Sequence, residues 1–186
     1  MLSAFEAQLK NLAEEKWYQF HCEIRNRVGK RATPVFENKL KNLIVETPKR
    51  LNSIYRHWNQ IKNGDETRHL GGFILAYLYN PTDFLSSEDY GLFGYLDDAY
   101  LVALAYERVL WEAHVCGNPL TEEEEDYLVN MKETRKLVRT IIPAESKQIE
   151  QMLQELIGGK KGRYLSSFRL SSEAGARIAE AGKQQV

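Results

Sequence analysis

The amino-acid sequence predicts an all-α protein, an irregular bundle of six to seven helices with an apolar helical hairpin at its centre. Three observations predict this fold class. Apolar residues recur at spacings of three and four through most of the chain, as in amphipathic helices. Helix-start signals, two Thr-Pro pairs and a threonine followed by four glutamates, recur between these stretches. No apolar–polar alternation persists long enough to predict a β-sheet.

The N-terminal third predicts one long helix followed by two short ones. Ser3 and Glu6 form a capping-box pattern, and the apolar spacing then continues to Val28, so a single helix of about seven turns is expected. Thr33–Pro34 and Thr47–Pro48 each restart a helix, because proline is tolerated at the first helical position. Two such starts in succession indicate short helices that meet at corners.

The middle of the chain predicts the central hairpin. Residues 65–79 form a compact apolar helix, which Asn80–Pro81 ends. The link 81–94 is expected to be a loop or a broken helix. Residues 95–115 then form a helix that is apolar nearly all round in its middle, as a helix in the centre of a core is. The pair Gly71–Gly72 inside the first helix indicates a close helix crossing, since each glycine costs about 1 kcal/mol relative to alanine there.

Two further helices are predicted after the hairpin. Thr121 is a capping residue, and Glu122–Glu125 follow it at the positive end of the helix, where carboxylates are stabilising. The four glutamates are therefore interpreted as helix-start chemistry. Pro143 starts the next helix, and Gly158–Gly159 follow its apolar face.

Charge divides the chain into three blocks. Residues 1–63 carry a net charge of +6, residues 64–159 carry −11 and residues 160–186 carry +4. We expect residues 1–159 to form a single helical domain that contains the 65–115 hairpin module, and residues 160–186 to be a basic C-terminal arm or tail. The basic ends are interpreted either as solvated helices or as a surface for an anionic partner, nucleic acid or an anionic membrane among them.

The composition is that of an ordinary globular domain. The chain has 186 residues, 43% hydrophobic and 27% charged. Cys22 and Cys116 are far apart, which indicates a reducing compartment rather than a disulfide framework. No stretch reaches the ~18–20 apolar residues that a transmembrane helix needs, and the N-terminus lacks a signal-peptide pattern. The sequence therefore predicts a cytoplasmic protein, with a peripheral membrane protein as the alternative.

One stretch carries a family resemblance. Pro81-x-Asp83 is followed by Gly94-Tyr95-Leu96-Asp97-Asp98, which opens the apolar helix. This pattern resembles the YkvA-like family, a bacterial domain of unknown function, over about residues 68–113. Ser86, Ser87, Glu88 and Asp89 stand where the family usually has an apolar, proline-rich link. The resemblance implies a helical hairpin module and no established activity.

The three aspartates of this pattern have two interpretations. As structural residues, Asp97 and Asp98 accept N–H groups in the first turn of the apolar helix, and Asp83 caps the preceding turn. Alternatively, the hairpin brings Asp83, Asp97 and Asp98 together. Clustered carboxylates repel one another unless they are protonated or hold a hard cation, so this alternative predicts a site for Mg²⁺ or Ca²⁺. No other cofactor is predicted.

Partner-binding residues are predicted in the hairpin and in the C-terminal arm. Tyr77, Tyr95 and Tyr100 are large apolar side chains with a polar tip, which suits a half-buried seam or an interface. The arm combines basic and aromatic residues, a pattern typical of proteins that contact nucleic acid or anionic lipid. The basic residues predicted to bind are Lys160, Lys161, Arg163 and Arg169.

No catalytic residue is predicted. The chain lacks the phosphate-loop, dinucleotide, nucleophile-elbow and zinc-protease motifs, and its four histidines have no ligand spacing. The favoured function is a non-enzymatic helical accessory or interaction protein that binds a protein partner or a second copy of itself. The first alternative is an enzyme that depends on a divalent cation held by the Asp cluster. The second is a protein held on an anionic membrane by its basic ends.

Overall fold

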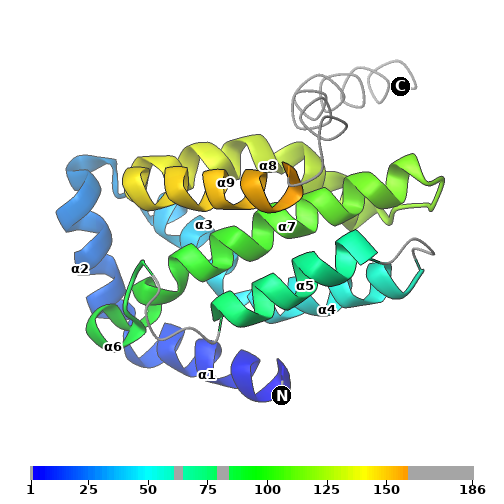
Figure 1. Ribbon diagram of the computed structural model, residues 1–186. Coiled ribbons are helices and arrows are strands. Elements are labelled where there is room, and N and C mark those ends of the chain that lie inside the picture. Colours follow the sequence, from blue (N-terminus) through cyan, green and yellow to red (C-terminus); the bar gives the residue numbers. More distant parts are fainter. Residues whose placement is uncertain (1, 61–64, 79–83, 159–186) are drawn as a thin grey trace.

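The computed structural model describes residues 2–60, 65–78 and 84–158, and within these ranges every regular element is helical. The helices pack side by side as an irregular bundle (Figure 1). The predicted all-α fold class is therefore confirmed. Residues 160–186, the predicted basic arm, lie outside the described residues.

The predicted seven-turn N-terminal helix is divided into two. Helix α1 (Leu2–Glu15) and helix α2 (Trp17–Val28) meet at Lys16, whose φ of −108° and ψ of 19° are not helical. The backbone N–H of Lys16 still donates to the carbonyl of Leu12, and the N–H of Phe20 donates to the carbonyl of Lys16, both at 3.0 Å. Because the hydrogen bonds continue across the junction, the chain bends without a loop (Figure 1). The apolar spacing continues as well, so no pattern in the sequence indicates the bend.

Helix α3 (Pro34–Val45) and helix α4 (Thr47–Gln60) begin at the two Thr-Pro pairs, but only the first threonine caps its helix. Thr33 Oγ1 accepts from the N–H of Phe36 at 3.2 Å. The hydroxyl of Thr47 instead donates backwards to the carbonyl of Leu43 at 3.2 Å, and the guanidinium of Arg50 donates to the same carbonyl at 2.7 Å. The corner is thus closed by two side-chain donors that share the carbonyl of Leu43 in the last turn of α3.

Helix α7 (Leu96–Val115) is the central element, as predicted. Of its 20 residues, 16 are buried, and α3, α4, α5 (Asp65–Leu78) and the last two helices pack around it. The link before it contains the short helix α6 (Ser87–Tyr90) and the 3-10 helix η2 (Gly91–Tyr95). A Cβ on Gly94 would lie 2.5 Å from Ser87 Cα. The glycine of the Gly-Tyr-Leu-Asp-Asp stretch is therefore required by the close approach of two backbone segments.

Helix α8 (Glu122–Ile141) and helix α9 (Pro143–Gly158) complete the bundle. The capping box predicted at the start of α8 is confirmed. Thr121 Oγ1 accepts from the N–H of Glu124 at 3.3 Å, and Glu124 Oε2 accepts from the N–H of Thr121 at 2.9 Å. In the part of the chain that is described, no helix is long and apolar enough to cross a membrane.

Removing the Thr121 hydroxyl is expected to lower the free energy of unfolding by about 1 kcal/mol, because the N–H of Glu124 loses its acceptor. Urea denaturation of Thr121→Ala measures this loss. Thr134→Ala is the matched control, because among the described residues its hydroxyl donates to a carbonyl of its own helix, that of Asn130. Equal losses in the two variants would mean that the cap does not stabilise α8.

Candidate functional site

Asp97 ties three segments together at the N-terminus of α7. Its carboxylate is fully buried, and Oδ2 accepts from the hydroxyl of Tyr77 on α5 at 3.1 Å. The same oxygen accepts from the backbone N–H groups of Phe84 and Leu85 at 3.1 and 3.3 Å. Asp97 therefore holds the end of the link and helix α5 against α7, whereas the sequence predicted a role in the first turn of its own helix.

The predicted metal site is only partly described. Asp97 and Asp98 are both buried in the first turn of α7, and Asp83 lies outside the described residues. Among the residues that are described, no group of three His, Cys, Asp or Glu side chains is placed to hold a metal ion. Three donors already point at Asp97 Oδ2, so a cation at that oxygen would have to displace them. The site for Mg²⁺ or Ca²⁺ stays a prediction.

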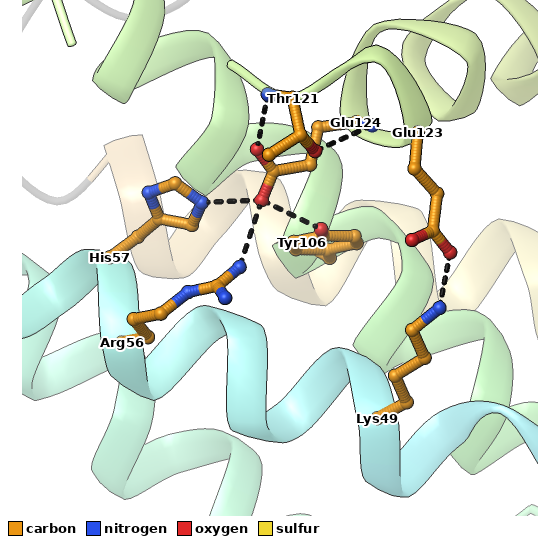
Figure 2. A network of polar contacts seen from close by, with 7 residues as sticks. All are labelled: Lys49, Arg56, His57, Tyr106, Thr121, Glu123 and Glu124. Carbon is orange, nitrogen blue, oxygen red and sulfur yellow. Dashed lines mark hydrogen bonds and ion pairs between the residues drawn. The ribbon is translucent and has the colours of Figure 1, made fainter. Parts of the chain in front are cut away.

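A polar network around Glu124 joins α8 to α4 and α7 (Figure 2). The carboxylate of Glu124 is buried, and its Oε1 lies 2.8 Å from His57 Nε2 and 3.2 Å from an Arg56 guanidinium nitrogen. The hydroxyl of Tyr106 donates to the same oxygen at 3.3 Å, while the N–H of Thr121 occupies Oε2. One carboxylate thus receives donors from two helices, α4 and α7, and from the turn before α8.

The electrostatics of this network follow from burial and hydrogen bonding. Burial alone would raise the pKa of Glu124, but donors from Thr121 and His57 outweigh it and hold that pKa below its ordinary value. Burial and the negative charge of Glu124 raise the pKa of Tyr106 to about 12. His57 Nδ1 is buried and has no hydrogen-bond partner among the described residues, which places the proton of a neutral ring on Nε2, facing Glu124.

The Glu124 network was missed at the sequence level. The capping box correctly placed Glu124 at the third position of its helix, whereas His57 was only one of four histidines without ligand spacing. The pairing of these two side chains depends on how α4 packs beside the start of α8, which no spacing within either helix shows. Chemically, the network holds α4, α7 and α8 together. The side chains around Glu124 are donors to its carboxylate, and none of them is arranged as a nucleophile activated by a base.

A second polar network connects α7 with α8 and α9. Tyr100 is fully buried and donates its hydroxyl to Glu150, which also accepts two hydrogen bonds from the Arg139 guanidinium at 2.8 and 2.7 Å. Burial opposes ionisation of Glu150, but Arg139 and Tyr100 hold its pKa below the ordinary value. Beside this network, Glu107 pairs with Arg135, and burial raises the pKa of Glu107.

The tyrosines predicted to bind a partner differ in how deeply they are buried. Tyr100 is in the core, Tyr77 is buried on α5, and Tyr95 is half-buried with its hydroxyl 2.9 Å from Gln8 Nε2. The four basic residues of the arm lie outside the described residues. Partner binding by these residues stays a prediction, and Tyr95 is the predicted tyrosine that reaches the surface.

An apolar groove of about 410 Å³, here called the α1/α4/α5 groove, lies between these three helices. Three of its side chains are large, apolar and exposed: Leu2 at 36%, Tyr55 at 64% and Leu75 at 52%. None of the described residues that line it is charged, although 27% of the chain is. They are Leu2, Ala4, Phe5, Gln8, Leu51, Ile54, Tyr55, Trp58, Gly71, Ile74, Leu75 and Leu78.

Gly71 gives the groove its shape where α4 meets α5. A Cβ at this position would lie 2.4 Å from Cζ3 of Trp58, so the indole ring rests directly on the backbone of α5. The close approach predicted from the glycine pair is confirmed at Gly71. A side chain here would displace Trp58, which itself lines the groove.

The α1/α4/α5 groove could not be predicted from the sequence. Leu2, Tyr55 and Leu75 come from three different helices, and each is an ordinary member of an apolar helical face. The groove exists because of how the three helices pack. No family model, curated protein or solved structure matches the chain, so the YkvA-like resemblance stays a prediction.

Proposed function

We propose that this protein is a non-enzymatic helical interaction protein, and that it receives the uncharged, apolar face of a helical protein partner in the α1/α4/α5 groove. The observation that carries the proposal is the groove itself, a hollow of about 410 Å³ beside three exposed apolar side chains. Contiguous apolar surface of this kind is typical of interaction sites, whereas single exposed apolar residues are normal on any protein.

The chemistry of the partner follows from the lining. Each charged group that enters an apolar groove must lose its water without gaining a counterion, which is costly. The described residues that line this groove offer no counterion, so the inserted face must be uncharged. An amphipathic helix presents such a face as side chains three and four residues apart, and helix-in-groove binding is a common mode of recognition.

Tyrosine and tryptophan in the groove support the same function. Tyr55 on α4 is largely exposed, and Trp58 one turn later forms part of the wall. These two residue types supply large contact areas and are enriched among the residues that dominate binding energy. Glu124 also holds α4 through His57, so the wall of the groove is held in place before a partner arrives.

A photo-crosslinking amino acid at position 75 tests the proposal. We expect p-benzoylphenylalanine at Leu75 to form one dominant protein adduct in cells, because this side chain faces the groove. The same label at Tyr18, which is 79% exposed on α2, is the control and should give no such adduct. Introducing Tyr55→Glu beside the label at position 75 should reduce the adduct at least tenfold, since a charge enters the interface.

Two results would contradict the proposed function. One is an equal yield of adducts from positions 75 and 18, which would mean nonspecific capture. The other is an adduct at position 75 that Tyr55→Glu leaves unchanged. Circular dichroism of each variant must first match the wild-type protein, so that a loss of binding is not a loss of folding.

A further inference from the structure

We propose that the corner between α2 and α3 binds the surface of an anionic lipid bilayer. This α2/α3 corner consists of Arg25 at the end of α2, Lys30 and Arg31 in the 3-10 helix η1 (Gly29–Arg31), and Val35 in the first turn of α3. All four side chains are exposed. None of them lines the α1/α4/α5 groove, so the inference does not depend on the proposed function.

The ion pairs show where the positive charge of the N-terminal third lies. Among the described residues, six of its basic side chains have an acidic partner: Lys10, Arg27, Lys39, Lys49, Arg50 and Arg56. Lys41 lies over the ring of Trp17, at 5.0 Å from its centre. The described cations that remain without an ion pair or ring contact are Lys16, Arg25, Lys30 and Arg31. Three of these four lie within seven consecutive residues, at the α2/α3 corner.

The end of helix α2 does not account for these cations. Basic side chains are stabilising at a helix C-terminus, and Arg25 and Arg27 occupy the last turn of α2. Arg27 also serves the fold, because its guanidinium lies 3.9 Å from Glu145 on α9. Lys30 and Arg31 follow the helix and belong to η1. At least two of the three unpaired cations therefore lie outside the turn whose carbonyl groups they could stabilise.

Acidic side chains near the corner do not neutralise it. Residues 16–45 contain two acidic residues, Glu23 and Glu37. Glu37 is buried, and its Oε1 lies 2.8 Å from His21 Nδ1. This contact places the first turn of α3 beside the middle of α2, one turn before Arg25. Glu23 is half-buried and lies two positions from Arg25, so the two side chains leave α2 in nearly opposite directions.

The exposed carboxylates at the start of α8 lie far from the corner. The contact of Arg27 with Glu145 places the end of α2 beside the start of α9, and therefore beside the end of α8 (Figure 1). Helix α8 has 20 residues and spans about 30 Å. Its first turn carries Glu122, Glu123 and Glu125, all exposed. Exposed charges are largely screened beyond about 8 Å at physiological ionic strength, so an anionic surface attracts the corner without meeting these carboxylates.

Val35 favours a lipid bilayer over a nucleic acid. Its apolar side chain is 66% exposed, four residues after Arg31. Surfaces that bind anionic membranes combine basic side chains, which face the headgroups, with apolar side chains that enter the boundary of the acyl chains. Proteins that bind single-stranded nucleic acid instead stack aromatic side chains on the bases. None of the four corner residues is aromatic.

Cosedimentation of the purified full chain with lipid vesicles tests the inference. We expect binding to phosphatidylcholine vesicles that contain about 30% phosphatidylserine, and binding about tenfold weaker or less to phosphatidylcholine alone. Each basic residue near such a surface contributes about fivefold, so Lys30→Gln/Arg31→Gln should weaken binding about 25-fold. The matched control is Lys132→Gln/Lys136→Gln, which removes the same charge from two exposed positions of α8 and should bind like the wild type.

Val35→Thr separates lipid binding from general attraction to anions. This change keeps the shape of the side chain but adds a hydroxyl, so it should weaken vesicle binding about fourfold and leave any binding of poly(U) RNA unchanged. Three results would overturn the inference: equal binding to the two kinds of vesicle, equal losses in the two double variants, or vesicle binding that Val35→Thr does not weaken. A wild type that binds poly(U) but not the anionic vesicles would assign the corner to nucleic acid instead. Circular dichroism confirms that each variant is folded.

Discussion

Replacing Glu124 with alanine is expected to lower the free energy of unfolding by about 3–5 kcal/mol. The buried donors at His57 Nε2 and the Tyr106 hydroxyl lose their acceptor, and so does the N–H of Thr121. Arg56 loses less, because its guanidinium is largely exposed and returns to water. A cavity left by the missing side chain adds to the loss.

Urea denaturation measures this effect, with Glu123→Ala as the matched control. Glu123 is the preceding residue in the same run of glutamates, but it is exposed and pairs with the exposed Lys49 (Figure 2). Surface ion pairs contribute at most about 1 kcal/mol, so the control should lose little stability. If the two variants lost the same free energy of unfolding, the contacts of Glu124 with His57 and Tyr106 would contribute nothing beyond what any carboxylate at a helix start contributes.

Acid should remove the contribution of Glu124. The pKa of this carboxyl is below its ordinary value in the folded protein, so its ionised form stabilises the fold at any pH above the unfolded pKa of about 4.3. That contribution is lost as the pH falls through the folded pKa. The stability difference between wild type and Glu124→Gln should therefore narrow as the pH falls below about 4. A difference that does not change with acid would mean that the charge of Glu124 contributes nothing.

The sequence predicted those features of the fold that depend on a single stretch of the chain. The buried helix α7 follows from an apolar run with no polar face, and the start of α8 follows from Thr121 and Glu124 three residues apart. The bend at Lys16 could not be predicted, because the apolar spacing and the backbone hydrogen bonds both continue through it. A bend of this kind is decided by what the two halves pack against.

The candidate sites depend on packing between distant segments, and the sequence predicted less of them. Gly71 correctly indicated a close approach, but not that Trp58 fills it beside a groove. Asp97 was recognised as a residue of interest from its place in the Gly-Tyr-Leu-Asp-Asp stretch, yet its donors are the backbone of the link and Tyr77. Spacing identifies which residues are unusual, whereas tertiary contacts decide what they do.

Replacing Asp97 with alanine is expected to lower the free energy of unfolding by about 3–4 kcal/mol, which corresponds to a fall in Tm of about 6–15 °C. The hydroxyl of Tyr77 and the N–H groups of Phe84 and Leu85 lose their shared acceptor in a buried position. Asp97→Asn should lose less, because its amide oxygen can still accept. Thermal melts of the two variants beside wild type measure the difference.

The control for Asp97 also separates its two interpretations. Asp89 lies in α6 of the same link but is exposed, so Asp89→Ala should change the Tm by at most about 2 °C. Because three donors surround Oδ2, we expect Mg²⁺, Ca²⁺ and EDTA to leave the wild-type Tm unchanged. A rise with one cation in wild type that Asp97→Asn abolishes would instead support the predicted metal site. In that case the donors now seen at Oδ2 must rearrange when the ion binds.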